Sequence, residues 1–252
     1  MRIKKTIKIS AVSYLNTFPF VYGILKSGLI SDFVLELDVP SVCASKLING
    51  DVDIALVPVG ALPRMTNTEI ITDYCIGAVR SVKSVVLLSQ VPLETLHTIY
   101  LDFDSGTSVQ LVKVLAHNFW HIEPVWKNLK SGQAESLTGK EALVAIGDKT
   151  FELVKNYQFV YDLAEEWIRF TSLPFVFALW MSVKPLPVTV IESLNNALAW
   201  GIARKEESLG FFKEKLPACG DCLDYLEENI SYEFDQPKKD GLALFLKYLQ
   251  GL

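Results

Sequence analysis

The amino-acid sequence predicts an α/β protein made of two lobes. Short runs rich in β-branched residues alternate with helical stretches over the first ninety positions, the pattern of a mainly parallel sheet covered by helices. Residues 50–57 and residues 139–146 show a weak internal similarity. In both segments a glycine precedes a predicted strand rich in alanine and β-branched residues. Half of the 252 residues are hydrophobic, so each lobe can bury a core of its own.

The first lobe is predicted to begin with four strands, at residues 7–12, 34–39, 53–57 and 85–89. Apolar residues at helical spacing predict a helix over 42–49, with Ser41 as its N-cap. Because the carboxyl ends of parallel strands meet at one edge of a sheet, a ligand is expected beyond those ends.

The second lobe is predicted to open with a strand at 98–101 and a polar turn at 102–108. A helix follows, whose apolar face consists of Leu111, Val112, Leu115 and Phe119. The apolar run at 175–181 is expected to return the chain to the first lobe as a buried strand. The predicted limits are therefore residues 1–89 and 175–252 for lobe 1, with residues 90–174 inserted as lobe 2.

The remainder after Pro187 is predicted to be helical and to pack on the first lobe. Leu194, Leu198 and Ile202 share one helix face, and a terminal helix is expected over 240–249. The sequence shows no recognisable chemistry in this part of the chain.

Composition excludes several classes of partner. With 24 basic and 29 acidic residues, the net charge is −5, which offers no general attraction for nucleic acid or an acidic membrane. The basic start lacks the apolar run of a signal peptide, and no uncharged stretch approaches the roughly 18 residues that span a bilayer. We therefore expect a cytoplasmic protein that holds an anionic ligand locally.

Metal and cofactor signals are weak. The segment from Cys219 to Cys222 has CxxC spacing without a second pair, and four reduced thiols are expected. His117 and His121 are four residues apart but lack the glutamate and third ligand of a zinc site. No glycine-rich phosphate loop is present. We expect neither a metal ion nor a cofactor.

The informative positions are two junctions between a strand and a helix. Residues 13–17 (Ser-Tyr-Leu-Asn-Thr) follow the first strand directly, and Pro19 lies in the first turn of the next helix. Residues 104–108 (Asp-Ser-Gly-Thr-Ser) place hydroxyls and free N–H groups at another helix start, where carboxylate or phosphate binds readily. Ordinary helix capping explains the same residue types, and this alternative stays open.

Several segments in order resemble the MqnA family of menaquinone biosynthesis, the chorismate dehydratases. They are 13–20, 84–89, 104–108, 146–148, 162–167 and 171–178. The resemblance implies a two-lobed fold similar to type II periplasmic binding proteins, with the ligand cleft between the lobes. It also implies a hydro-lyase that removes water from chorismate without a cofactor, on the futalosine route.

The resemblance implies roles for particular residues. Asn16 and Ser84 are the expected catalytic residues. Expected contacts to the substrate come from Ser13, Tyr14, Thr17, Ser105, Thr107, Ser108 and Asp148. The last of these either bonds a ligand hydroxyl or caps the next helix.

One position departs from the family pattern. Gly106 stands where the family usually has an arginine. Backbone N–H groups, Arg80, Arg169 or Lys83 are the candidates to replace its charge.

Two other classes compete with the enzyme, and the fold alone does not separate them. A non-catalytic binding or sensor protein for a small carboxylate would need the same cleft. A transcription regulator is disfavoured, because no helix-turn-helix precedes the first strand. A homodimer stays open.

Overall fold

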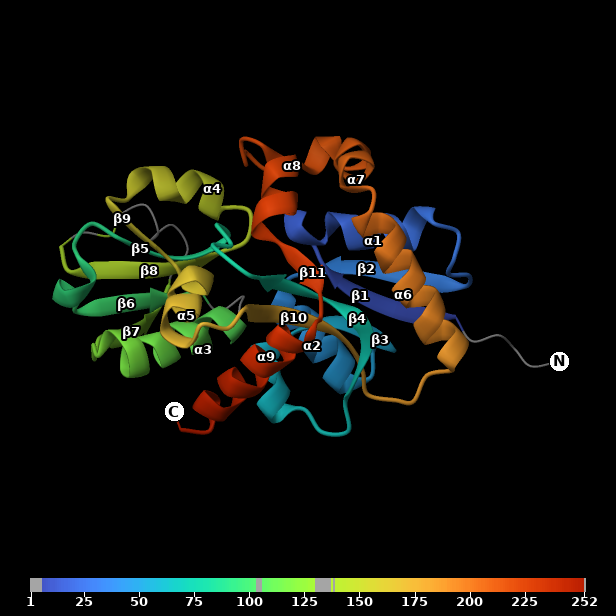
Figure 1. Ribbon diagram of the computed structural model, residues 1–252, viewed down its shortest axis with the longest axis horizontal. Helices are drawn as coiled ribbons and strands as arrows, with labels where there is room; N and C mark the ends of the chain where they lie inside the picture. Colours follow the sequence, from blue (N-terminus) through green and yellow to red (C-terminus); the bar gives the residue numbers. More distant parts are fainter. Residues whose placement is uncertain (1–5, 103–105, 130–136, 138, 252) are drawn as a thin grey trace.

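The computed structural model describes residues 6–102, 106–129, 137 and 139–251. Within these residues the strands form one six-stranded and one five-stranded sheet, which lie side by side along the longest axis of the molecule (Figure 1). The α/β class predicted from the alternation of strands and helices is confirmed.

The first sheet has the strand order β11-β4-β10-β3-β1-β2. Its strands are β1 (Ile7–Val12), β2 (Phe33–Asp38), β3 (Ile54–Pro58), β4 (Glu69–Ala78), β10 (Phe175–Ser182) and β11 (Ser231–Glu233). β1 pairs in parallel with β2 and β3, whereas β10 runs antiparallel between β3 and β4. Every residue of β3 and β10 is buried, which matches their sequences, apolar throughout except for Ser182 at the end of β10.

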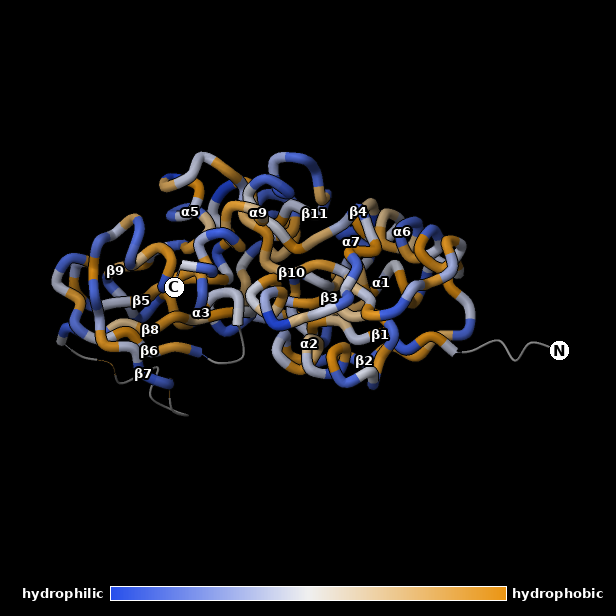
Figure 2. The backbone as a smooth tube through the Cα atoms, turned by 90° about the horizontal axis from the view of Figure 1, so that it is seen from below, coloured by the Kyte–Doolittle hydropathy of each residue, from blue (hydrophilic) through white to orange (hydrophobic). Residues whose placement is uncertain are grey.

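The second sheet has the order β7-β6-β8-β5-β9. Its strands are β5 (Val85–Ser89), β6 (Thr98–Leu101), β7 (Val125–Asn128), β8 (Glu141–Ile146) and β9 (Phe159–Asp162). β6 is parallel to β7 and β8, and β5 is antiparallel to β8 and β9. Figure 2 shows that the strands in the middle of both sheets are mostly hydrophobic.

The strand β5, which was expected in the first lobe, belongs to the second sheet. β5 forms its hydrogen bonds with β8 and β9, so the chain passes from one sheet to the other between Ala78 and Val85. An isolated apolar run of five residues carries no information about which sheet it joins, because that depends on partners 53 to 76 positions later.

Helices cover both sheets (Figure 1). The α-helices are α1 (Phe18–Lys26), α2 (Pro40–Asn49), α3 (Gly106–Leu115), α4 (Thr150–Leu153), α5 (Leu163–Thr171), α6 (Val188–Ile202), α7 (Lys205–Phe211), α8 (Cys222–Asp224) and α9 (Gln236–Leu249). Shorter 3₁₀ turns are η1 (Leu15–Thr17), η2 (Val59–Arg64), η3 (Leu93–Thr95), η5 (Val154–Asn156) and η6 (Lys213–Lys215), and π-helical turns are η4 (Ala116–Trp120) and η7 (Tyr225–Asn229). None of the helices in this described part combines the length and apolar character that crossing a lipid bilayer requires.

Two local expectations differ from the structure. Val39, and not Ser41, is the N-cap of α2, because Pro40 already has the backbone angle of a first helical residue. Cys219 and Cys222 form a disulfide instead of two reduced thiols, since a turn with Gly220 at φ +70° brings their Cα atoms to 5.4 Å. Cys43 and Cys75 are buried free thiols, as expected.

Candidate active site

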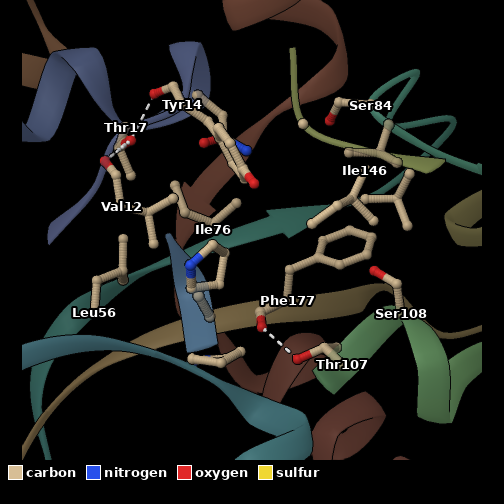
Figure 3. A pocket seen from close by; sticks show the side chains of 17 residues that line it. Val12, Tyr14, Thr17, Leu56, Ile76, Ser84, Thr107, Ser108, Ile146 and Phe177 are labelled. Atoms are coloured by element: carbon tan, nitrogen blue, oxygen red, sulfur yellow. Dashed lines mark hydrogen bonds between the residues drawn. The ribbon is translucent and has the colours of Figure 1, made fainter. Parts of the chain in front are cut away.

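A cavity of about 60 Å³ is lined by elements of both sheets. Its polar lining consists of Tyr14, Asn16, Thr17, Ser84, Thr107 and Ser108, and the side chains of Val12, Leu56, Ile76, Ile146 and Phe177 make up much of the rest (Figure 3). No charged side chain is among the described residues that line it. A ligand here meets hydroxyls, an amide and backbone groups against apolar walls, as in most small-molecule sites.

The loop after β1 is held in place by its own side chains. The Thr17 hydroxyl lies 2.6 Å from the carbonyl oxygens of both Val12 and Tyr14 and donates its hydrogen to this pair. The Tyr232 hydroxyl donates to the backbone carbonyl of Asn16 at 3.0 Å. Thr17, predicted to contact the substrate, therefore uses its one hydrogen to fix the loop that carries Asn16.

Among the described residues, one oxygen atom of the Asn16 side chain lacks a hydrogen-bond partner. Its Oδ1 is buried and has no hydrogen-bond partner among the described residues. A buried acceptor without a donor costs about 1–3 kcal/mol, so native structures rarely leave one unpaired. Asn16 is one of the residues that line the cavity.

Ser84 lies immediately before β5 and is 1% exposed. Its Oγ accepts a hydrogen bond from the Tyr225 hydroxyl at 2.8 Å, and its carbonyl accepts from the Gly147 amide at 2.9 Å. Asn16 and Ser84 reach the same cavity from different sheets. The structure thus brings the two expected catalytic residues together.

Tyr14 and Asp148 connect the first sheet to the second, across the cavity. The Tyr14 ring lies so close to Gly147 that a Cβ there would be 2.8 Å from its Cζ, and Gly147 has φ +70°. The Asp148 carboxylate accepts from the backbone N–H of Leu15 at 3.1 and 3.2 Å. Asp148 therefore neither caps the next helix, whose N-cap is Lys149, nor lines the cavity.

Burial raises the pKa of the Asp148 carboxyl from its ordinary 3.8 to about 6, and the hydrogen bond from Leu15 opposes this in part. An acid whose pKa is higher in the folded state stabilises the fold only while it is protonated. The contribution of Asp148 to the unfolding free energy is complete below pH 4 and is lost as the pH rises through 6. This contribution is at most about 3 kcal/mol.

We expect Asp148→Asn to remove this pH dependence, because the amide oxygen still accepts from Leu15 but does not ionise. Urea unfolding at pH 4, 5, 6 and 7.5 measures it. The variant should match the wild type at pH 4 and exceed its unfolding free energy at pH 7.5 by up to about 3 kcal/mol. A difference that does not change with pH would show that Asp148 does not titrate in this range.

The first turn of α3 supplies Thr107 and Ser108 to the cavity. The Thr107 Oγ1 accepts from the Gly60 amide at 3.0 Å and donates to the Phe177 carbonyl at 3.2 Å. Its hydroxyl therefore joins α3 to the first sheet and has no hydrogen left for a substrate. Ser105 lies outside the described residues.

The three cations considered as replacements for an arginine at Gly106 form ion pairs outside the cavity lining. Arg80 pairs with Glu228 at 2.7 Å, Arg169 with Glu166 at 2.6 Å, and Lys83 with Asp224 at 3.6 Å. The other groups expected to replace the arginine are the backbone N–H groups at the start of α3, and this helix start lies at the cavity. The helix dipole favours an anion there.

The site differs from the sequence expectation in two further ways. Ser13 is exposed, and it is not among the described residues lining the cavity. Tyr225 and Tyr232 belong to the C-terminal part in which no chemistry was expected, yet their hydroxyls contact Ser84 and Asn16. No local signal marks them, because they meet their partners across 141 and 216 positions of sequence.

In the described part of the chain, no group of three or more His, Cys, Asp or Glu side chains is placed to hold a metal ion. His117 lies at another surface hollow, beside Lys113 and Trp126.

Sequence comparison finds relatives over most of the chain. A family model described as menaquinone biosynthesis matches residues 7–251. A chorismate dehydratase of Thermus thermophilus is 26% identical over 234 residues, which is 84% of this chain and 84% of that protein.

Solved structures share the fold at low sequence identity. A protein of Archaeoglobus fulgidus superposes with a TM-score of 0.76 at 14% identity, covering 100% of this chain and 98% of that one. A Candida albicans gene product is described as having the generic periplasmic binding protein fold. It superposes with a TM-score of 0.64 at 14% sequence identity, covering 97% of this chain and 94% of that one. The sulphonate binding protein SsuA of Escherichia coli superposes with a TM-score of 0.63 at 14% sequence identity, covering 97% of this chain and 85% of that one. The predicted fold similar to periplasmic binding proteins is confirmed.

Proposed function

Because this chain belongs to the menaquinone biosynthesis family, we propose that it is a chorismate dehydratase, a lyase that acts in the cytoplasm. The relative of that name covers 84% of the chain. The single observation in the structure that supports the proposal best is the buried, unpaired Oδ1 of Asn16 at the cavity, because chorismate carries a ring hydroxyl that can donate to it.

The proposed reaction converts chorismate into 3-[(1-carboxyvinyl)oxy]benzoate and water. The ring proton beside the enol ether is acidic through conjugation with the ring carboxylate. When this proton leaves, the electron pair of the broken C–H bond forms the new ring double bond and expels the neighbouring hydroxyl as hydroxide. The hydroxide takes up a proton to become water, and the ring becomes aromatic. The substrate therefore supplies the driving force, while the protein orients it and stabilises the charge that moves onto the ring carboxylate.

The cavity residues fit these requirements in distinct ways. Asn16 Oδ1 accepts from the ring hydroxyl and positions it for departure. Ser84 Oγ already accepts from Tyr225, so its own hydrogen is directed to the ligand or to a bound water. The N-terminus of α3, with Ser108 in its first turn, faces a substrate carboxylate.

The proton acceptor is proposed to be the side-chain carboxylate of the substrate or a water held by Ser84. The neutral amide of Asn16 is a poor base, since efficient bases have pKa values near the working pH. Asp148 has such a pKa, but both its oxygens lie against the Leu15 amide.

We also propose that the two sheets mark two lobes that separate to admit the substrate. The cavity of about 60 Å³ is smaller than the 300–1,000 Å³ common for small-molecule sites. Contacts that must open lie between Tyr14 and Gly147 and between Leu15 and Asp148.

Incubation of the purified protein with chorismate tests the proposal. We expect the ultraviolet absorbance of the diene to fall while an aromatic product 18 mass units lighter accumulates. Heat-denatured protein is the control, because chorismate also rearranges without an enzyme. Tight binding of chorismate without turnover would instead favour a binding or sensor protein.

A further inference from the structure

We propose that Tyr225 is a positioning residue for the reaction, which holds the Ser84 hydroxyl so that its hydrogen faces the cavity. This inference rests on the proposed chorismate dehydratase function. It assigns a role to a residue of the C-terminal segment, 141 positions away from Ser84 in sequence.

The hydrogen bond between the two hydroxyls determines which of them donates to a ligand. Tyr225 donates to Ser84 Oγ at 2.8 Å, and both side chains are buried, with 2% and 1% of their surface exposed. A serine hydroxyl otherwise rotates to suit any neighbour. With one lone pair of Ser84 taken by the phenol, its own hydrogen points elsewhere, and Ser84 lines the cavity (Figure 3).

The phenol remains a donor at every working pH. Burial raises the pKa of Tyr225 well above its ordinary value of 10, opposed by its contacts with Ser84 and Asn16. The Tyr225 hydroxyl therefore stays protonated and keeps its hydrogen for Ser84 Oγ.

The segment that carries Tyr225 is fastened to the loop that carries Ser84. Asp221 caps the start of α8 by accepting from the amides of Leu223 and Asp224 at 3.0 Å each. The Asn229 side chain donates to the Ser81 carbonyl at 2.9 Å. The bond from Asn229 and the ion pairs Arg80–Glu228 and Lys83–Asp224 join residues 221–229 to residues 80–84 at three points.

A second aromatic ring also supports Tyr225. Phe151 packs edge-on against it, with ring centroids 5.1 Å apart. The ring, which belongs to η7, therefore also has a contact from Phe151 of α4, which reduces its freedom to move. A rigid Tyr225 ring holds the Ser84 hydroxyl in one position, and such support keeps an active site in its productive geometry.

The test is Tyr225→Phe, which keeps the ring and removes only the hydroxyl. We expect kcat for chorismate to fall about tenfold with KM changed less than about threefold, because a hydrogen bond that orients a donor is worth roughly that factor. Loss of one hydrogen bond leaves the variant folded, and its melting temperature should fall by only a few degrees. Incorporation of 4-aminophenylalanine at position 225 restores an N–H donor and should recover most of kcat.

A double-mutant cycle separates positioning from a general structural effect. In the Ser84→Ala background, Tyr225→Phe should cost less than about twofold in kcat, because no hydroxyl remains to be oriented. Tyr100→Phe is the matched control, since Tyr100 is also buried and donates to Glu141 at 3.1 Å but does not line the cavity. It should retain wild-type kcat.

Wild-type kcat for Tyr225→Phe, or a loss that adds fully to that of Ser84→Ala, would overturn the positioning role and leave the dehydratase function intact. Failure of the wild-type protein itself to convert chorismate would overturn both. The two failures are therefore distinguishable in one set of assays.

Discussion

Replacing Asn16 with alanine is expected to reduce kcat for chorismate by about 100-fold or more, while the protein stays folded. The reason is that the substrate loses the contact by which Asn16 orients its ring hydroxyl, and misplacing a reacting group has effects of that size. Because this oxygen is unpaired in the ligand-free protein, its removal should raise the unfolding free energy slightly, by up to about 1 kcal/mol. Turnover and urea unfolding measure the two effects.

Asn16→Asp separates positioning from proton transfer at the same place. If Asn16 only positions the substrate, a carboxylate there should repel the dianion and lower kcat/KM. Retained or increased activity would instead indicate that this position transfers the proton directly. Ser84→Ala should also lose most activity, and rates near wild type for both alanine variants would contradict the assignment of the site.

Gly201→Ala is expected to destabilise the protein by about 3 kcal/mol or more, lowering Tm by roughly 10 °C. A Cβ at this position in α6 would lie 1.9 Å from the Pro19 carbonyl oxygen and 2.8 Å from the Gly23 amide nitrogen. Both are backbone atoms, so α1 and α6 must move apart. Differential scanning calorimetry and chorismate turnover are the measurements.

Activity should fall in the same variant. Pro19 lies in the first turn of α1, directly after the loop that carries Asn16, so a displaced α1 moves the loop. Gly210→Ala is the matched control, because a Cβ at Gly210 in α7 meets nothing within 4 Å. That variant should be as stable as the wild type or up to about 1 kcal/mol more stable. Equal Tm values for the two variants would contradict the close helix contact.

The strands with strong local signals were predicted well. The structure has β1 at Ile7–Val12, β5 at Val85–Ser89 and β6 at Thr98–Leu101, each with the predicted limits. β4, at Glu69–Ala78, was missed because its residues do not form one continuous apolar run. The disulfide between Cys219 and Cys222 was also missed, since CxxC spacing alone does not distinguish a bonded pair from free thiols.

The sequence by itself determined the α/β class, the position of residues 13–17 at a strand end and, through the order of its segments, the family. These properties depend on residues that are near each other along the chain, so local pattern contains them. Only the tertiary structure decided that β5 joins the second sheet, that Thr17 and Thr107 use their hydroxyl hydrogens internally, and that Tyr225 contacts Ser84. These depend on contacts between distant segments, whose geometry is set only when both sheets have packed.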